Sequence, residues 1–224
     1  MSGYKIKFNG IDRLYDKYSW RLTKRAKLVW QSGQVLQGSY QAELEKTLAE
    51  HYKRKYAIAV GSATDGLYFA LKSLGLNSQS KIVCPAFGYI AMSGAIKRLG
   101  AKPIFVDVDQ NGTLGTLSVG LNPDAVLYAN LFGNLADYDS IKKFCDSRKI
   151  PLIEDAAQSM GSIYKQIPSG KLGDISVFSF DPMKNLPTFG TGGMVLTDND
   201  KIYKRIISVS YTHLRAHETL RYLV

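Results

Sequence analysis

The sequence predicts an α/β fold of three layers, with a mainly parallel sheet and helices on both of its faces. Short apolar runs alternate along the chain with longer segments of helical periodicity, which is the pattern of βαβ units. Glycine or proline closes many of these segments, as expected where a strand or helix ends. The 224 residues are enough for one large domain or two small ones.

Most of the helices are predicted from residues that recur at helical spacing, whereas the first is expected in a polar and aromatic segment. In the second of them, Leu44, Leu48 and Tyr52 lie on one face, and the third and fourth stop at Gly75 and Gly100. In chain order, the predicted helices are 12–31, 41–54, 65–74, 90–99 and 140–147.

The strands are predicted from short apolar runs, several of them bounded by glycine or proline. In chain order, the predicted strands are 56–60, 82–84, 103–108, 125–131, 151–154, 176–180 and 194–197. A sheet with this connectivity binds ligands at the carboxyl ends of its strands. Residues that directly follow a strand are therefore the first candidates for a functional site.

Composition excludes several classes of protein. No apolar run is long enough for a membrane helix, and the first residues contain no apolar stretch typical of a secretory signal. Cys84 and Cys145 are too few for a disulfide scaffold or a cysteine-rich zinc site, so we expect a cytoplasmic protein without a structural metal. The net charge of +10 favours anionic partners, such as nucleic acid, a membrane surface or phosphorylated small molecules.

The last residues read as foreign to the rest of the chain. Residues 209–219 look like a translated reading frame of the adapter used in transposase-based sequencing libraries, and 220–224 fit the index sequence that comes after such an adapter. We therefore expect one native domain at 1–208 and a non-native tail at 209–224. The alternative is an amphipathic helix with His213 and His217 one turn apart as a metal pair.

Two segments after predicted strands carry small or aromatic residues. At 61–65, free backbone N–H groups and a helix dipole could bind an anion, or the segment could simply cap the helix through Thr64 or Asp65. Phe87 and Tyr89 follow the next strand, where they could stack on a flat ring or belong to the core.

Two further segments carry charged residues. The apolar strand at 151–154 runs into Glu154 and Asp155, which is costly unless the carboxylates are paired or solvated. Asp155 could face a cation inside the fold or be a surface acid. Lys184 lies between a buried strand and the glycine-rich return at 191–194, where it could be an amine nucleophile or an ordinary surface lysine.

Taken together, these segments resemble the nucleotide-sugar aminotransferases of the DegT/StrS family. The motifs that carry the resemblance are E-D-A-A-Q at 154–158, S-F-x-x-x-K-N at 179–185 and T-G-G-M at 191–194. The family consists of pyridoxal-phosphate enzymes with the aspartate-aminotransferase fold, fold type I. The resemblance runs from about 33 to 208 and implies the large, cofactor-binding domain, without the small C-terminal domain that completes the site.

The resemblance assigns a role to each candidate residue. Lys184 matches the lysine that forms the Schiff base with pyridoxal phosphate, and Asp155 matches the carboxylate that pairs with the pyridinium nitrogen. Gln158 and Tyr89 match the residues on the two faces of the ring. The phosphate contacts that it implies are Ala63, Thr64 and Ser179.

The implied function is conversion of a keto group on a nucleoside-diphosphate sugar to an amine, with glutamate as amino donor and a homodimeric parent enzyme. Three residues depart from the family pattern: Asn130 stands where a histidine is frequent, Met183 replaces a small residue and Thr191 replaces an acidic one. None of them touches the proposed pair of Lys184 and Asp155.

Two other functions remain open at this point. One is a sugar dehydratase on the same fold, but in that branch of the family a histidine typically replaces the lysine, so Lys184 disfavours it. The other is a non-enzymatic, basic protein that binds nucleic acid. The sequence contains no helix-turn-helix, zinc motif or basic stripe with interleaved aromatics that would support it.

Overall fold

The computed structural model describes residues 10–218, with side chains described up to residue 210. The helices are α1 (Ile11–Ser32), α2 (Ser39–His51), α3 (Ala63–Ser73), α4 (Ala91–Arg98), α5 (Tyr138–Arg148) and α6 (Asp200–Glu218), with a 3-10 turn η1 (Leu131–Gly133). The strands of the main sheet are β1 (Tyr56–Val60), β2 (Lys81–Pro85), β3 (Lys102–Val106), β4 (Ala125–Ala129), β5 (Leu152–Asp155), β8 (Ile175–Ser179) and β9 (Gly193–Thr197). A small hairpin consists of β6 (Ile163–Tyr164) and β7 (Ile167–Pro168).

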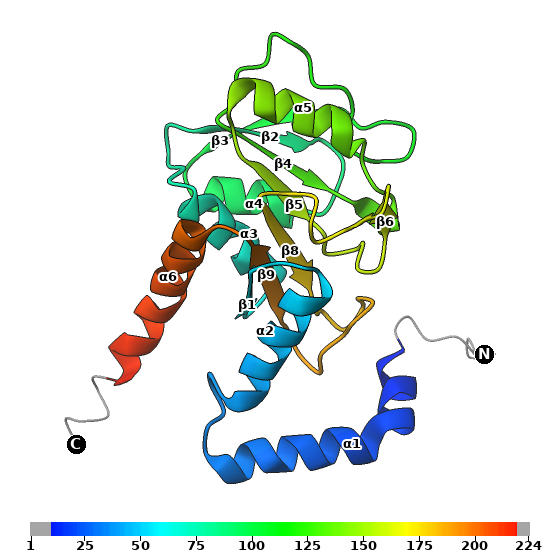
Figure 1. Cartoon of the computed structure of the whole chain (residues 1–224), viewed down its shortest axis with the longest axis vertical. Helices are drawn as coiled ribbons and strands as arrows, with labels where there is room; N and C mark the ends of the chain where they lie inside the picture. Colours follow the sequence, from blue (N-terminus) through cyan, green and yellow to red (C-terminus); the bar gives the residue numbers. More distant parts are fainter. Residues whose placement is uncertain (1–9, 219–224) are drawn as a thin grey trace, which may run out of the picture.

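The main sheet is mostly parallel, as predicted. Its strand order is β1-β9-β8-β5-β4-β2-β3. The neighbours from β8 to β3 all pair parallel, whereas β9 pairs antiparallel with both β1 and β8. The predicted α/β class is therefore confirmed (Figure 1).

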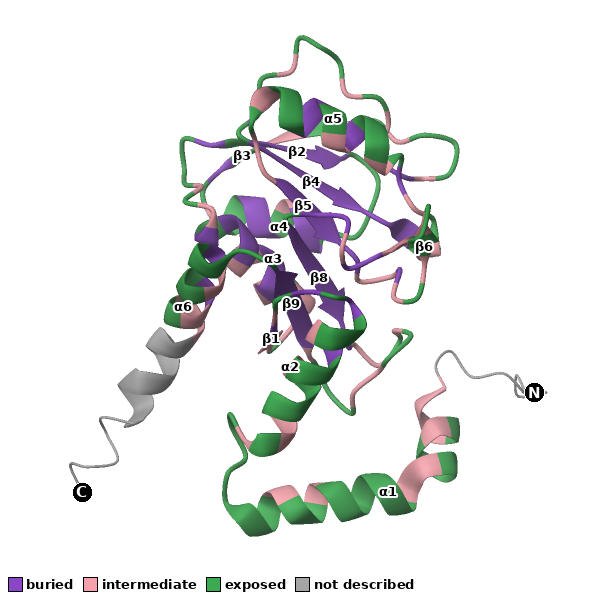
Figure 2. Ribbon diagram, viewed as in Figure 1, coloured by how far each residue is buried: buried purple, intermediate pink, exposed green. Residues whose placement is uncertain are grey.

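Alternating side chains place helices on both faces of the sheet. Along β4, Ala125 and Leu127 belong to the core cluster that includes residues of α3, α4 and α6, while Val126 and Tyr128 belong to the cluster under α5. This is the two-residue period of a strand buried on both faces. Figure 2 shows the sheet as the buried layer between more exposed helices.

Each predicted helix and strand is present, with boundaries that shift by a few residues. The largest shift is at the end of the second predicted helix, expected at 54, because α2 ends at His51 and Tyr52 is its C-cap. The strand predicted to end at 131 ends at Ala129, where the chain turns into η1. The N-cap of α3 is Ser62, and not Thr64 or Asp65 as the sequence suggested. The Ser62 Oγ accepts the Asp65 N–H at 3.1 Å. Thr64 is therefore inside the first turn.

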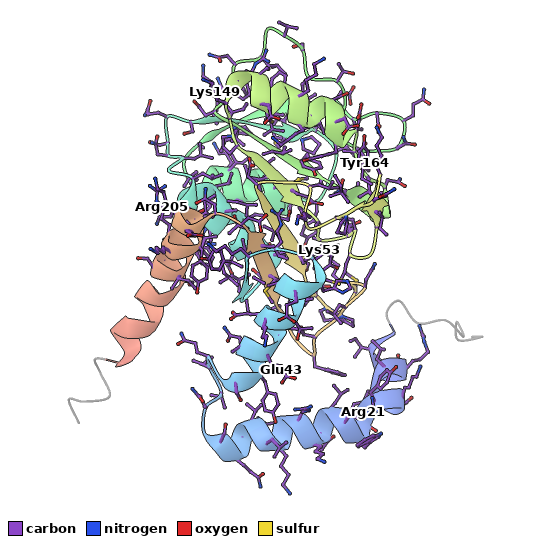
Figure 3. The ribbon with its side chains drawn as sticks, viewed as in Figure 1. Arg21, Glu43, Lys53, Lys149, Tyr164 and Arg205 are labelled. Carbon is purple, nitrogen blue, oxygen red and sulfur yellow. The ribbon has the colours of Figure 1, made fainter. Side chains whose placement is uncertain are left out.

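The helix α6 was not predicted as an element of the native domain. Asn199 precedes it, and its side-chain oxygen accepts the N–H groups of Lys201 and Ile202, which is a recognisable N-terminal signal. Arg205 ties α6 to α3 by donating to the Ser73 carbonyl at 2.8 Å (Figure 3).

The backbone of α6 continues into the predicted tail and ends at Glu218. The side chains of 211–224 lie outside the described residues, including those of His213 and His217. The non-native origin of 209–224 therefore stays a prediction, as does the alternative metal pair.

Helix α1 lies apart from the sheet (Figure 1) and contains no buried residue. Its first turns approach the segment after β8, where the rings of Tyr15 and Phe189 meet edge to face at 6.3 Å. Over residues 10–218, no helix has the length and apolar character needed to cross a membrane.

Candidate active site

One cavity brings together all the residues that the sequence singled out for cofactor binding. It lies where β4, β5 and β8 end and α3 begins. The predicted residues that line it are Ala63, Thr64, Tyr89, Asp155, Gln158, Ser179 and Lys184. Asn130, Met183 and Thr191, which depart from the family pattern, also line it. Phe87 does not, and at 54% exposed it is not a core residue either.

Asp155 is the last residue of β5 and reaches the cavity from a buried position. Its side chain is only 6% exposed, so the alternative of a surface acid is wrong. Oδ1 accepts the Ala157 N–H at 3.0 Å, and within the described chain Oδ2 has no hydrogen-bond partner. Oδ2 is thus available to a group inside the cavity.

Burial, with a smaller contribution from the negative charge of Glu154, raises the pKa of the Asp155 carboxyl to about 6. The Ala157 hydrogen bond and the positive charge of Lys184 act in the opposite direction, but burial outweighs them. A cation placed at Oδ2 would stabilise the ionised carboxylate and so lower its pKa. Asp155 therefore has the environment expected of a carboxylate that pairs with a bound positive charge.

Lys184 lies in the turn that follows β8. Its backbone N–H donates to the Asp181 carbonyl at 2.9 Å, which fixes the turn. Its ammonium lies 6.0 Å from the centroid of the Tyr89 ring, and it forms no ion pair within the described chain. An amine held in this way can react with a carbonyl group in the cavity.

The opposite end of the cavity provides hydrogen-bond donors. The N–H groups of Ala63 and Thr64, in the first turn of α3, have no acceptor in the described part of the chain. Ser179 uses its oxygen to accept the Asp181 N–H at 3.3 Å, so its hydroxyl proton can be donated. Two backbone N–H groups, a hydroxyl and a helix dipole suit a dianionic phosphate.

A glycine makes this end of the cavity possible. Gly193 begins β9 and pairs with Ser179 across the sheet. A Cβ at this position would lie 2.7 Å from the Ala63 nitrogen and 3.0 Å from the Phe178 carbonyl oxygen, which are backbone atoms that cannot easily move. Only glycine lets β9 pass this close to the start of α3.

The two residues predicted to flank the ring come from separate loops. The Gln158 side chain is fixed because its Oε1 accepts the Phe132 N–H at 3.0 Å. Tyr89 follows β2 and is 64% exposed, so its ring is accessible and not part of the core. Both line the cavity, whereas their placement on opposite faces of a ring stays a prediction.

Glu154 is the important residue near the site to which sequence analysis gave no role. It is fully buried and points away from Asp155 because neighbouring strand residues alternate in direction. Its carboxylate accepts hydrogen bonds from Asn130 Nδ2, Ser169 Oγ, the N–H groups of Gly170 and Leu172, and Ser176 Oγ. The two-residue period of a strand indicates that the two side chains point in opposite directions, but it does not indicate which groups surround Glu154.

Glu154 also fixes Asn130, the residue that stands where the family frequently has a histidine. Asn130 is buried; it donates to Glu154 at 2.9 Å and its Oδ1 accepts the Ala136 N–H at 3.1 Å. Both functional ends of its amide are therefore used. Asn130 shapes the cavity wall from a position that leaves it little freedom to rotate.

Known proteins resemble this chain over most of its length. A model of the DegT/DnrJ/EryC1/StrS aminotransferase family matches residues 19–223. UDP-2-acetamido-2-deoxy-3-oxo-D-glucuronate aminotransferase of Pseudomonas aeruginosa is 34% identical over 199 residues, which are 84% of this chain and 55% of that protein. GDP-perosamine synthase of Escherichia coli O157:H7 is 35% identical over 185 residues, which are 80% and 50% of the two chains.

The fold is also found among solved structures. NtdA of Bacillus subtilis, solved with the bound cofactor PMP, superposes with a TM-score of 0.85 at 29% identity and covers 94% of this chain and 49% of that chain. The chain spans about half the length of the curated relatives that it matches.

Proposed function

Because the chain belongs to the DegT/DnrJ/EryC1/StrS aminotransferase family, we propose that it is the cofactor-binding part of a pyridoxal-phosphate enzyme. The longer enzyme converts a keto group on a nucleoside-diphosphate sugar to an amine. The observation that carries the proposal is the single cavity in which Lys184, Asp155 and the phosphate donors of α3 converge.

The donor set of the cavity suits this cofactor. Ala63, Thr64 and Ser179 offer neutral donors to a phosphate, and the buried Asp155 offers one free carboxylate oxygen to a protonated ring nitrogen. When bound, pyridoxal phosphate supplies an electron-accepting ring that stabilises negative charge at the substrate Cα.

Four residues of the chain bind the cofactor or take part in proton transfer. Lys184 would hold the cofactor covalently through its amine and, when its amine is free, would transfer a proton at the Cα of the amino donor. Asp155 keeps the ring nitrogen protonated because a full negative charge faces it. Gln158 and Tyr89 hold the ring between them.

Other features of the parent enzyme belong to the same proposal. Residues 1–208 form the large domain, and a small domain in the other half of the enzyme completes the substrate site. We propose glutamate as amino donor, a homodimer as the assembly and the cytoplasm as location. Lys184 favours an aminotransferase over the dehydratase branch, and the family match disfavours a nucleic-acid-binding protein.

Covalent attachment of the cofactor tests the proposal. The protein is incubated with pyridoxal phosphate and reduced with borohydride, and its peptides are analysed by mass spectrometry. We expect the added mass on Lys184 in the wild type and its loss in Lys184→Ala. In the full-length enzyme, Lys184→Ala should also abolish transamination of a keto sugar.

Lys201→Ala is the matched control, because Lys201 is an exposed lysine on α6 outside the cavity. It should keep the attachment. Added mass on another lysine in the wild type, or undiminished mass in Lys184→Ala, would refute the assignment of Lys184.

A further inference from the structure

A second cavity adjoins the candidate active site. It lies between the first turns of α1 and the segment 182–187 after β8. Met183 and Lys184 line both cavities. The two cavities therefore share part of their walls, and Lys184 faces both.

The charged residues that line this second cavity are all positive. They are Arg13 and Lys17 of α1, together with Lys184. Asp181, the acid closest in sequence to this segment, lines only the first cavity, and its carboxylate accepts the Met183 N–H at 3.0 Å. The cavity thus combines three cationic side chains with no carboxylate in its described wall.

Arg13 and Lys17 are four residues apart and lie on the same face of α1. Like charges at this spacing destabilise a helix by a few tenths of a kcal/mol. In the described part of the chain neither side chain forms an ion pair. An anion between the two would turn an unfavourable pair into a favourable one.

A ring contact keeps this end of α1 near the cavity. Tyr15, between the two cations in sequence, meets Phe189 of the segment after β8 at 6.3 Å. Since α1 contains no buried residue, this contact is one of the features that hold Arg13 and Lys17 in the wall of the cavity that Lys184 also lines.

Building on the proposed function, the geometry points to Arg13 and Lys17 as the subsite for the diphosphate group of the nucleoside-diphosphate sugar. The planar guanidinium of Arg13 matches two phosphate oxygens, and Lys17 contributes a mobile point charge. With the diphosphate at this position, the sugar lies on the side of Lys184, where the amine is transferred. The subsite thus recognises the group that all nucleoside-diphosphate sugars share, whatever their base or sugar.

The test measures binding of inorganic pyrophosphate to the cofactor-loaded chain by calorimetry. Loading fills the phosphate end of the first cavity, so the probe reports on other sites. We expect Arg13→Gln combined with Lys17→Gln to weaken pyrophosphate binding at least tenfold. The matched control is Arg21→Gln combined with Lys24→Gln. It removes the same two kinds of charge from the same helix, but neither residue lines the cavity.

The outcomes separate this inference from the proposed function. Binding that falls at least tenfold in the first double variant and less than twofold in the control supports the subsite. Equal losses in both variants, or no saturable binding by the wild type, overturn it. Attachment of the cofactor to Lys184 is read separately by mass spectrometry, and its absence in the wild type would count against the proposed function instead.

Discussion

At the scale of single residues, the buried carboxylates Glu154 and Asp155 have opposite environments although they are neighbours in sequence. Glu154 is surrounded by donors from side chains and backbone. Asp155 has one backbone donor and a free oxygen in the cavity. The Glu154 carboxylate thus has its hydrogen bonds from within the fold, whereas an oxygen of Asp155 is available to a ligand in the cavity.

The cofactor-free chain should lose stability as Asp155 ionises. Because burial raises its folded-state pKa to about 6, the folded chain binds this proton more tightly than the unfolded chain, whose carboxyl has a pKa of about 3.9. The stabilising contribution is complete below about pH 4 and is lost as pH rises through 6, by about 3 kcal/mol in total.

Urea unfolding of the wild type and of Asp155→Asn at several pH values measures this contribution. The difference between the two free energies of unfolding should fall between pH 4 and 7, since the amide does not titrate and other acids cancel. A difference that does not change with pH would contradict the raised pKa.

In the full-length enzyme, Asp155→Asn should keep the covalent attachment but slow transamination at least a hundredfold, which corresponds to about 2.7 kcal/mol in the activation barrier.

At the scale of elements, the junction of β9 with the start of α3 controls the phosphate end of the cavity. Gly193→Ala should destabilise the chain by about 2 kcal/mol or more, because its Cβ would meet the backbone of Ser62 and Ala63 at less than 3 Å. It should also weaken cofactor binding. Thermal unfolding and cofactor titration measure the two effects.

Gly190→Ala is the matched control for this change. Gly190 lies three residues earlier, and no atom lies within 4 Å of the position that a Cβ would take there. Its substitution should shift the melting temperature by no more than about 2 °C, the range of an ordinary surface change. Similar losses in both variants would show that the close approach at Gly193 is unimportant.

The elements also show what sequence can and cannot predict. Apolar periodicity was sufficient for the sheet and for the residues at its carboxyl edge, including Asp155 and Lys184. It did not predict the hairpin of β6 and β7, since two-residue strands have no periodicity. Nor did it identify Ser62 as the cap, because Ser62, Thr64 and Asp65 all have side chains that can cap a helix.

The role of Glu154 was beyond prediction for a different reason. Its donors come from Asn130 and from 169–176, up to 24 residues away in sequence. No local pattern states that such segments meet around one carboxylate. The second cavity has the same origin, since α1 reaches Lys184 only through the folded chain.

At the scale of the whole molecule, removal of 209–224 tests the predicted non-native tail. The buried residues of α6, Ile202 and Ile206, precede the tail. A chain that ends at 208 should therefore melt within about 2 °C of the full chain. Because the family match continues to 223, this measurement decides whether the tail contributes to the native fold.

A chain that ends at 199 is the matched control. It loses both buried isoleucines, which contribute about 2 kcal/mol or more each, and should melt roughly 10 °C lower. If removal of 209–224 alone lowered the melting temperature by more than about 5 °C, the tail would be part of the native fold.

The position of β9 has a consequence for the order in which the chain can fold during synthesis. In the main sheet β1 is an edge strand, and its partner is β9, with Tyr56 opposite Thr197. A ribosome must therefore add every other strand of this sheet before β1 finds its neighbour. Until then, the exposed edges of β1 and β8 are open to other chains. Of the strands in this sheet, β9 comes last in the sequence, and it is the one that joins β1 to β8.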